Sequence, residues 1–120
     1  MSIEDEITKA IGAHGVWKMR LRAAIDTGKT DADIADVAKD NLCAFGKWLY
    51  GPTIPAAVSA GADYATARKL HADFHKCAAT ILECAVTGNK AKADALFAGD
   101  YVKASSSLTA AMMKWKADSH

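Results

Sequence analysis

Two histidines four residues apart are the side chains of this sequence best suited to chemistry. His71 and His75 lie in a segment with helical spacing of apolar residues, so their rings project from one helix face. One cation could therefore accept nitrogen atoms from both rings. His14 and Cys43 are the residues that could complete a shell of four ligands. Three imidazoles and one thiolate suit zinc in a tetrahedral site, and we predict His14, Cys43, His71 and His75 as its ligands.

The same histidine pair does not favour a hydrolytic enzyme. Zinc proteases with the pattern H-E-x-x-H use the glutamate as a general base, whereas Ala72 occupies that position and Asp73 points away from the imidazoles on a helix. Four protein ligands also leave no open position for a catalytic water. We therefore predict no enzyme and no catalytic residues. A small metallohydrolase, and a bundle whose histidines merely pack in the core, are the less favoured alternatives. Nickel or cobalt could also occupy such ligands in a preparation.

Gly46, three residues after Cys43, supports a ligand role for the thiol. A free cysteine is commonly a small buried hydrophobe. Glycine inside a helix, however, costs about 1 kcal/mol relative to alanine, so it should have a packing reason. We expect Gly46 to share a helical face with Cys43 and to admit a neighbouring helix, or a ligand ring carried on that helix.

The elements that must position these residues are helices. Alanine is frequent, there are two prolines, and runs of β-branched residues are absent. A first helix, capped by Ser2 and ended by Gly28, would turn His14 inward. Further helices are predicted over about 42–50, 55–87 and 89–98, and again after Gly99-Asp100. We predict an all-α fold, an antiparallel four-helix bundle with one broken or short extra helix, forming a single domain over residues 1–120.

The long predicted helix carries two neighbouring apolar stripes. One includes Cys77 and Cys84, which we interpret as core or dimer-interface thiols, and the other includes the two histidines. Together the stripes are wider than a small monomeric bundle needs to bury. We therefore predict a homodimer.

Charge and composition exclude several kinds of partner. Fifteen basic and fourteen acidic residues give a net charge of +1, which offers no electrostatic case for nucleic acid or an anionic membrane. The start of the chain lacks signal-peptide features, and the longest uncharged run is too short to span a bilayer. Three cysteines without a close pair argue against a disulfide framework. We expect a soluble, cytoplasmic protein.

Three short motifs resemble those of a known family. A-H-x-x-W-K around His14, L-C-x-F-G-K-W around Cys43 and L-H-x-x-x-H at His71 and His75 follow one another as in the chemoreceptor zinc-binding domain family. The resemblance covers essentially the whole chain and implies that these four residues are the zinc ligands. It also implies that the packing residues around the site are Trp17, Phe45, Gly46 and Trp48.

This resemblance carries expectations about function. The family occurs in cytoplasmic bacterial signalling proteins, attached to chemoreceptors or diguanylate cyclases, as a zinc-responsive and usually dimeric regulatory bundle. The sequence contains no chemoreceptor signalling hairpin and no cyclase motif, so the output lies in another chain or in a part of the protein missing from this fragment. We expect a zinc-binding sensory domain in chemotaxis or cyclic-di-GMP control. The alternative is an oxidant sensor acting through zinc-bound Cys43.

Overall fold

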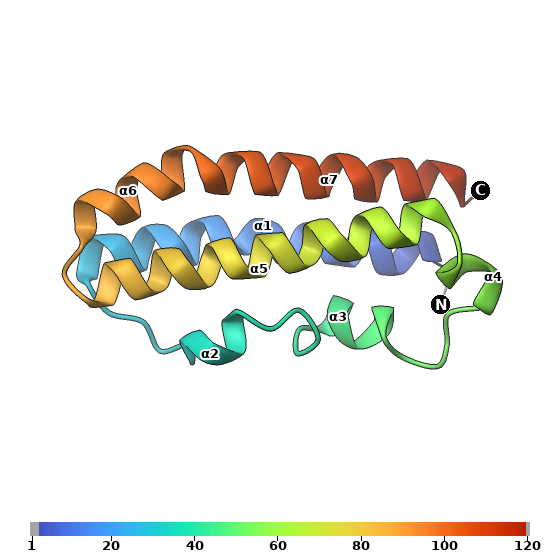
Figure 1. Ribbon diagram of the computed structural model, residues 1–120, viewed down its shortest axis with the longest axis horizontal. Helices are drawn as coiled ribbons and strands as arrows, with labels where there is room; N and C mark the ends of the chain where they lie inside the picture. Colours follow the sequence, from blue (N-terminus) through green and yellow to red (C-terminus); the bar gives the residue numbers. More distant parts are fainter. Residues whose placement is uncertain (1–2, 120) are drawn as a thin grey trace.

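The structure, a computed structural model that describes residues 3–119, is helical along most of its length (Figure 1). No strand occurs within these residues, and the all-α prediction is confirmed. The expected cap at Ser2 lies outside the described residues. The helices are α1 (Ile3–Thr27), α2 (Ile34–Val37), α3 (Ala44–Leu49), α4 (Ala56–Ser59), α5 (Ala62–Val86), α6 (Lys90–Ala98) and α7 (Asp100–Asp118).

Three long rods lie side by side, formed by α1, by α5 and by α6 together with α7 (Figure 1). The fourth side is a segment from residue 28 to residue 61, in which α2, α3 and α4 are joined by irregular chain. Helix α5 is central, because it packs against α1, α2, α4, α6 and α7. One continuous helix over 55–87 was predicted, but the structure divides it into α4 and α5. The division occurs at Gly61, whose extended backbone (φ −82°, ψ 161°) caps the start of α5.

Local sequence signals account for the ends of the long helices. Acidic residues occupy the first turn of α1, where the helix dipole favours negative charge. Gly28 ends α1 with a φ of 70°, and its N–H donates to the Ala24 carbonyl oxygen at 2.8 Å. Gly88 follows α5 with a φ of 83°. These left-handed positions let the chain reverse without the steric cost that a side chain would add.

The core lies between the three rods and extends under α3. Both apolar stripes predicted for the long helix face this core, since Phe74, Ile81 and Leu82 of α5 are fully buried. Cys84 is also buried, and Cys77 is half-buried. The wide apolar surface that motivated the dimer prediction is therefore covered by other helices of the same chain. It no longer argues for a second copy.

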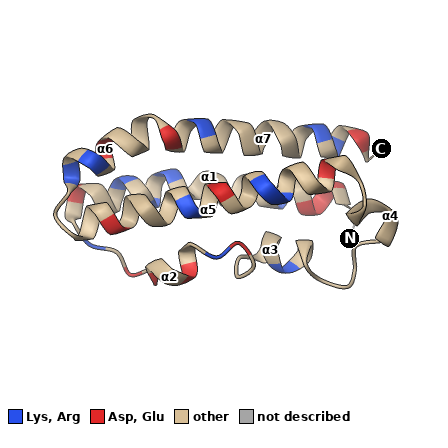
Figure 2. Ribbon diagram, in the orientation of Figure 1, with Lys and Arg blue, Asp and Glu red and all other residues tan. Residues whose placement is uncertain are grey.

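Charged side chains are interspersed over the helices. In the view of Figure 2, acidic and basic positions alternate along α5, α7 carries both signs, and neither sign forms a continuous face. Within residues 3–119, no helix combines the length and hydrophobicity that crossing a bilayer requires.

Candidate metal centre

The structure brings together all four residues predicted as metal ligands. His14 comes from α1, His71 and His75 come from α5, and Cys43 immediately precedes α3. One nitrogen or sulfur atom from each residue lies within 4.8 Å of the others. The three histidines are buried and Cys43 is half-buried. Residues far apart in the sequence therefore converge where α1, α5 and the 28–61 segment meet.

The separations of these atoms suit a tetrahedral zinc ion. His71 Nε2 lies 3.0 Å from His14 Nε2, 3.0 Å from His75 Nε2 and 3.3 Å from Cys43 Sγ. Cys43 Sγ lies 3.9 Å from His14 Nε2. Zinc bonds of about 2.0–2.3 Å place tetrahedral ligand atoms about 3.3–3.6 Å apart. These four separations are close to that range, and all four ligand atoms lie within 4.8 Å of one another, so modest side-chain movements would bring the set to bonding geometry.

Backbone carbonyls hold two of the imidazoles. His14 Nδ1 donates to the Ala10 carbonyl oxygen at 2.7 Å, and His75 Nδ1 donates to the Val37 carbonyl oxygen at 3.0 Å. With the proton on Nδ1, each ring presents an unprotonated Nε2 to the centre. A single proton on His71 Nε2 could not hydrogen-bond well to the Nε2 lone pairs of both His14 and His75. A cation at the centre would satisfy both lone pairs, so the donor set fits a metal.

His71 is held differently from the other two histidines. Its Nδ1 atom is buried and has no hydrogen-bond partner among the described residues. Ring packing orients it instead, since the Phe45 ring meets it edge-on at a centroid distance of 5.0 Å. Phe45 also meets His14 edge-on at 5.9 Å. The packing role that the family resemblance implied for Phe45 therefore has a contact to support it.

Cys43 lies just outside a helix, which corrects the prediction that a helix over 42–50 would include it. Its backbone is extended (φ −75°, ψ 163°), and its Sγ atom accepts a hydrogen bond from the Gly46 N–H at 3.4 Å. The expected reason for Gly46 also differs. A Cβ atom there would lie 1.8 Å from the Asp40 carbonyl oxygen, so Gly46 admits the preceding loop of its own segment rather than a neighbouring helix.

Burial keeps the metal-free site neutral at pH 7. Burial lowers the pKa of His14 to about 4, and burial with the neighbouring His75 and His14 lowers the pKa of His71 to about 2. Burial also lowers the pKa of His75 and raises the pKa of the Cys43 thiol. The imidazole lone pairs are thus free to bind a cation. The thiol must lose its proton when it becomes a ligand.

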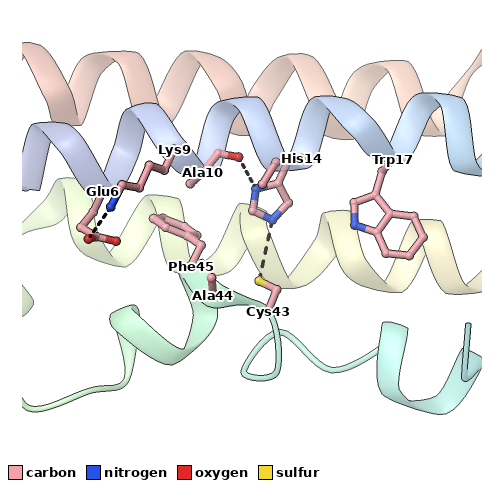
Figure 3. A pocket seen from close by; sticks show the side chains of 9 residues that line it. Glu6, Lys9, Ala10, His14, Trp17, Cys43, Ala44 and Phe45 are labelled. Atoms are coloured by element: carbon pink, nitrogen blue, oxygen red, sulfur yellow. Dashed lines mark hydrogen bonds and ion pairs between the residues drawn. The ribbon is translucent and has the colours of Figure 1, made fainter.

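Cys43 is the most accessible of the four residues. A cavity of about 130 Å³ lies beside it, and Figure 3 shows the thiol and the His14 ring facing each other along the cavity. A second pocket, of about 270 Å³, reaches Cys43 and His75 from the side of α2. His71 lines neither pocket. Ions and small molecules can therefore approach the centre from the thiol side.

Trp48 extends the packing from the site towards α7. Trp48 stacks at a tilt on Phe45 at 5.8 Å and on Trp115 of α7 at 5.5 Å. Trp17 is half-buried and carries the Arg20 guanidinium 3.9 Å from its ring centroid. Sequence reasoning missed the carbonyls of Ala10 and Val37, because a backbone acceptor leaves no signal in residue type.

A comparison with protein-family models supports this assignment of the centre. The model described as "Chemoreceptor zinc-binding domain" matches residues 14–82, more than half of the chain, and the match begins at His14 and includes the other three residues. No curated protein and no solved structure is similar enough to match the chain.

Proposed function

The chain belongs to the chemoreceptor zinc-binding domain family, and we propose that it is a regulatory domain whose zinc is held by His14, Cys43, His71 and His75. Zinc is the cofactor of the domain, as its family establishes. One observation carries the ligand assignment: three Nε2 atoms and one thiol converge, with two of the rings fixed so that their lone pairs point inward.

The proposed action is a clamp on the 28–61 segment. Helices α2, α3 and α4 contain four, six and four residues, too few to be stable alone. The large buried side chains that fix the segment are Val37, Phe45 and Leu49. Bound zinc supplies a cross-link between this segment and the rods α1 and α5. Structural zinc contributes on the order of 10–16 kcal/mol in small peptides, and a fraction of that would shift a two-state element.

Cys43 is the ligand that we expect to move. It is the single thiol of the set, it lies outside a regular helix, and it lines both pockets. His71 and His75, in contrast, belong to the central helix. Loss of the metal would release the segment at Cys43 first, while the histidines stay in place.

The cellular role belongs to the same proposal. We propose a cytoplasmic bacterial signalling role, in chemotaxis or cyclic-di-GMP control, with the output in a chemoreceptor or cyclase partner; the family description, which names chemoreceptors, supports this. We treat the fold as an antiparallel four-helix bundle whose second member is segmented. The alternating chain directions of α1, the 28–61 segment, α5 and α6–α7 in Figure 1 support that description.

We also propose that the domain forms a homodimer, through the outward face of α1. Val16 and Met19 are 53% and 75% exposed there. Gly12 and Gly15 lie beside them with open space where a side chain would stand, although glycine costs about 1 kcal/mol within a helix. Sedimentation velocity tests this: Val16→Glu should give a monomer where wild type gives a dimer. A monomeric wild type at micromolar concentration would exclude it.

Oxidant sensing is a second candidate, favoured by the access of solvent to Cys43. Peroxide would transfer one oxygen to the sulfur, giving a sulfenic acid and water, and the oxidised sulfur would bind the metal poorly. The test is zinc release on peroxide treatment, followed with a chromophoric chelator. Zinc retention with Cys43 still reduced would exclude this candidate.

Metal content per chain is the experiment that tests the main proposal. Untagged wild type should contain near-stoichiometric zinc by elemental analysis, and the Cys43→Ala/His71→Ala variant should lose it. Cys77→Ala is the matched control, because it removes a thiol outside the centre. Wild type without metal, even after zinc is supplied and the excess removed, would overturn the proposal.

A further inference from the structure

A side-chain contact closes the segment that presents Cys43. The Tyr50 hydroxyl donates to Asp40 Oδ2 at 2.5 Å, so the two ends of the segment 40–50 are joined outside the metal centre. From this contact we propose that Asp40 and Tyr50 are positioning residues that hold the Cys43 thiol at the metal. The inference rests on the proposed function, since it assumes that Cys43 is a ligand.

The backbone of Asp40 is fixed by the same segment. Its carbonyl oxygen lies against Gly46, where a Cβ atom would come within 1.8 Å of it. Asp40 therefore touches the middle of α3 through its backbone and the residue after α3 through its carboxylate. Cys43 lies three residues further along, within the loop that both contacts close. Its position is thus determined by how Asp40 is held against α3.

Little else holds the stretch between Asp40 and Cys43. Asn41 and Leu42 are exposed. The other end of the segment is anchored to the body, because the buried Tyr64 hydroxyl donates to the Leu49 carbonyl oxygen at 2.6 Å. Phe45 adds its contacts with His14 and His71. Opening the Asp40–Tyr50 contact would therefore free the Cys43 end of the segment while α3 stays docked.

The carboxylate of Asp40 also carries a negative charge three residues before Cys43, on the loop that presents the thiol. A zinc ion with one thiolate leaves a net charge of +1, which a nearby carboxylate stabilises. Asp40 thus has two roles, contact and charge, whereas Tyr50 contributes the contact alone.

Variants can separate the two roles. Tyr50→Phe removes the hydrogen bond and keeps the charge, while Asp40→Asn removes the charge and keeps an acceptor. Zinc affinity is measured by competition with a chromophoric chelator, for each variant and for their combination, with Cys43 present and in a Cys43→Ala background. Asp26→Asn is the matched control, because that exposed carboxylate pairs with Arg22 on α1 and lines neither pocket that reaches the centre.

We expect Tyr50→Phe to weaken zinc binding about 10-fold, as loss of an outer-sphere contact commonly does. The same change should have no effect in the Cys43→Ala background, because no thiol remains to be positioned. In cobalt-substituted protein, Tyr50→Phe should also lower the thiolate-to-cobalt charge-transfer absorption per bound ion. Circular dichroism should stay unchanged. If Tyr50→Phe fails to fold, the comparison of Asp40→Ala with Asp40→Asn tests the same contact, because both variants remove the charge and only Asn keeps an acceptor.

Two results would overturn the inference while leaving the zinc site intact. The first is that Tyr50→Phe has the zinc affinity and cobalt absorption of wild type, although Cys43→Ala weakens zinc binding. The other is an equal loss in both backgrounds, which would mean a general effect on the fold. Wild-type affinity in Cys43→Ala alone is a different outcome, since it would refute the thiol ligand of the proposed function.

Discussion

His14 and His75 are held in the same way: each donates its Nδ1 proton to a backbone carbonyl oxygen and turns its Nε2 atom towards the centre. The carbonyl belongs to α1 for His14 and to α2 for His75. Two of the three imidazoles are therefore oriented for a metal by the backbone alone. Because Val37 lies in the 28–61 segment, α2 is part of the site as well as α3.

Removing the thiol should weaken zinc binding without abolishing it. We expect Cys43→Ala to lower zinc affinity at least about 10-fold, because three buried imidazoles remain as ligands. Chelator competition measures the affinity. Cys77→Ala should bind zinc as wild type does. Equal affinity of Cys43→Ala and wild type would rule out the role assigned to the thiol.

Zinc removal should loosen the 28–61 segment selectively. The three rods are joined by the apolar core, whereas the segment depends on a few buried side chains and on the centre. Hydrogen exchange followed by mass spectrometry should show faster exchange in peptides from residues 28–61 after chelation. Peptides from the middle of α5 should change little. A uniform increase along the whole chain would contradict the clamp.

Gly46→Ala should destabilise the protein, because the new Cβ atom would overlap the Asp40 carbonyl. Overpacking of this kind costs about 1–3 kcal/mol, and here it would also displace Cys43. Thermal unfolding and zinc affinity should both decrease. Lys47→Ala, at an exposed position of the same helix, serves as the control. If Gly46→Ala is as stable as wild type and binds zinc as tightly, the loop at Asp40 can move to accept the Cβ atom without a loss of stability.

The metal-free protein should lose stability as the pH falls below about 6.5, the ordinary pKa of histidine. The folded pKa of His14 is about 4 and that of His71 is about 2, so below pH 6.5 the unfolded chain binds protons that the folded chain does not. Well above pH 6.5 these histidines are neutral in both the folded and the unfolded chain, and the loss vanishes. As the pH falls from about 7.5 to 5.5, each of the two histidines should lower the free energy of unfolding by roughly 1 kcal/mol.

Urea unfolding in the presence of a chelator, at both pH values, measures this dependence. His71→Leu should show a smaller difference between the two pH values than wild type, since one buried histidine is missing. The same difference in both proteins would mean that His71 does not contribute.

Much of the site was predictable because its chemistry follows helical spacing. His71 and His75 share a face whatever surrounds their helix, and the apolar pattern of α1 turns His14 inward. The convergence of these three residues with Cys43 is confirmed by the structure. Their role as ligands stays a prediction until metal content is measured.

The sequence by itself determined the helical class, the inward direction of the histidines and the motifs of the family, since all of these depend on residue type and short-range period. Tertiary structure decided the rest. It placed Cys43 outside α3, set Gly46 against Asp40, and buried both stripes of α5 within one chain. It also brought the Val37 carbonyl to His75, 38 residues away. Such contacts depend on the path of irregular chain between helices, which no local period encodes.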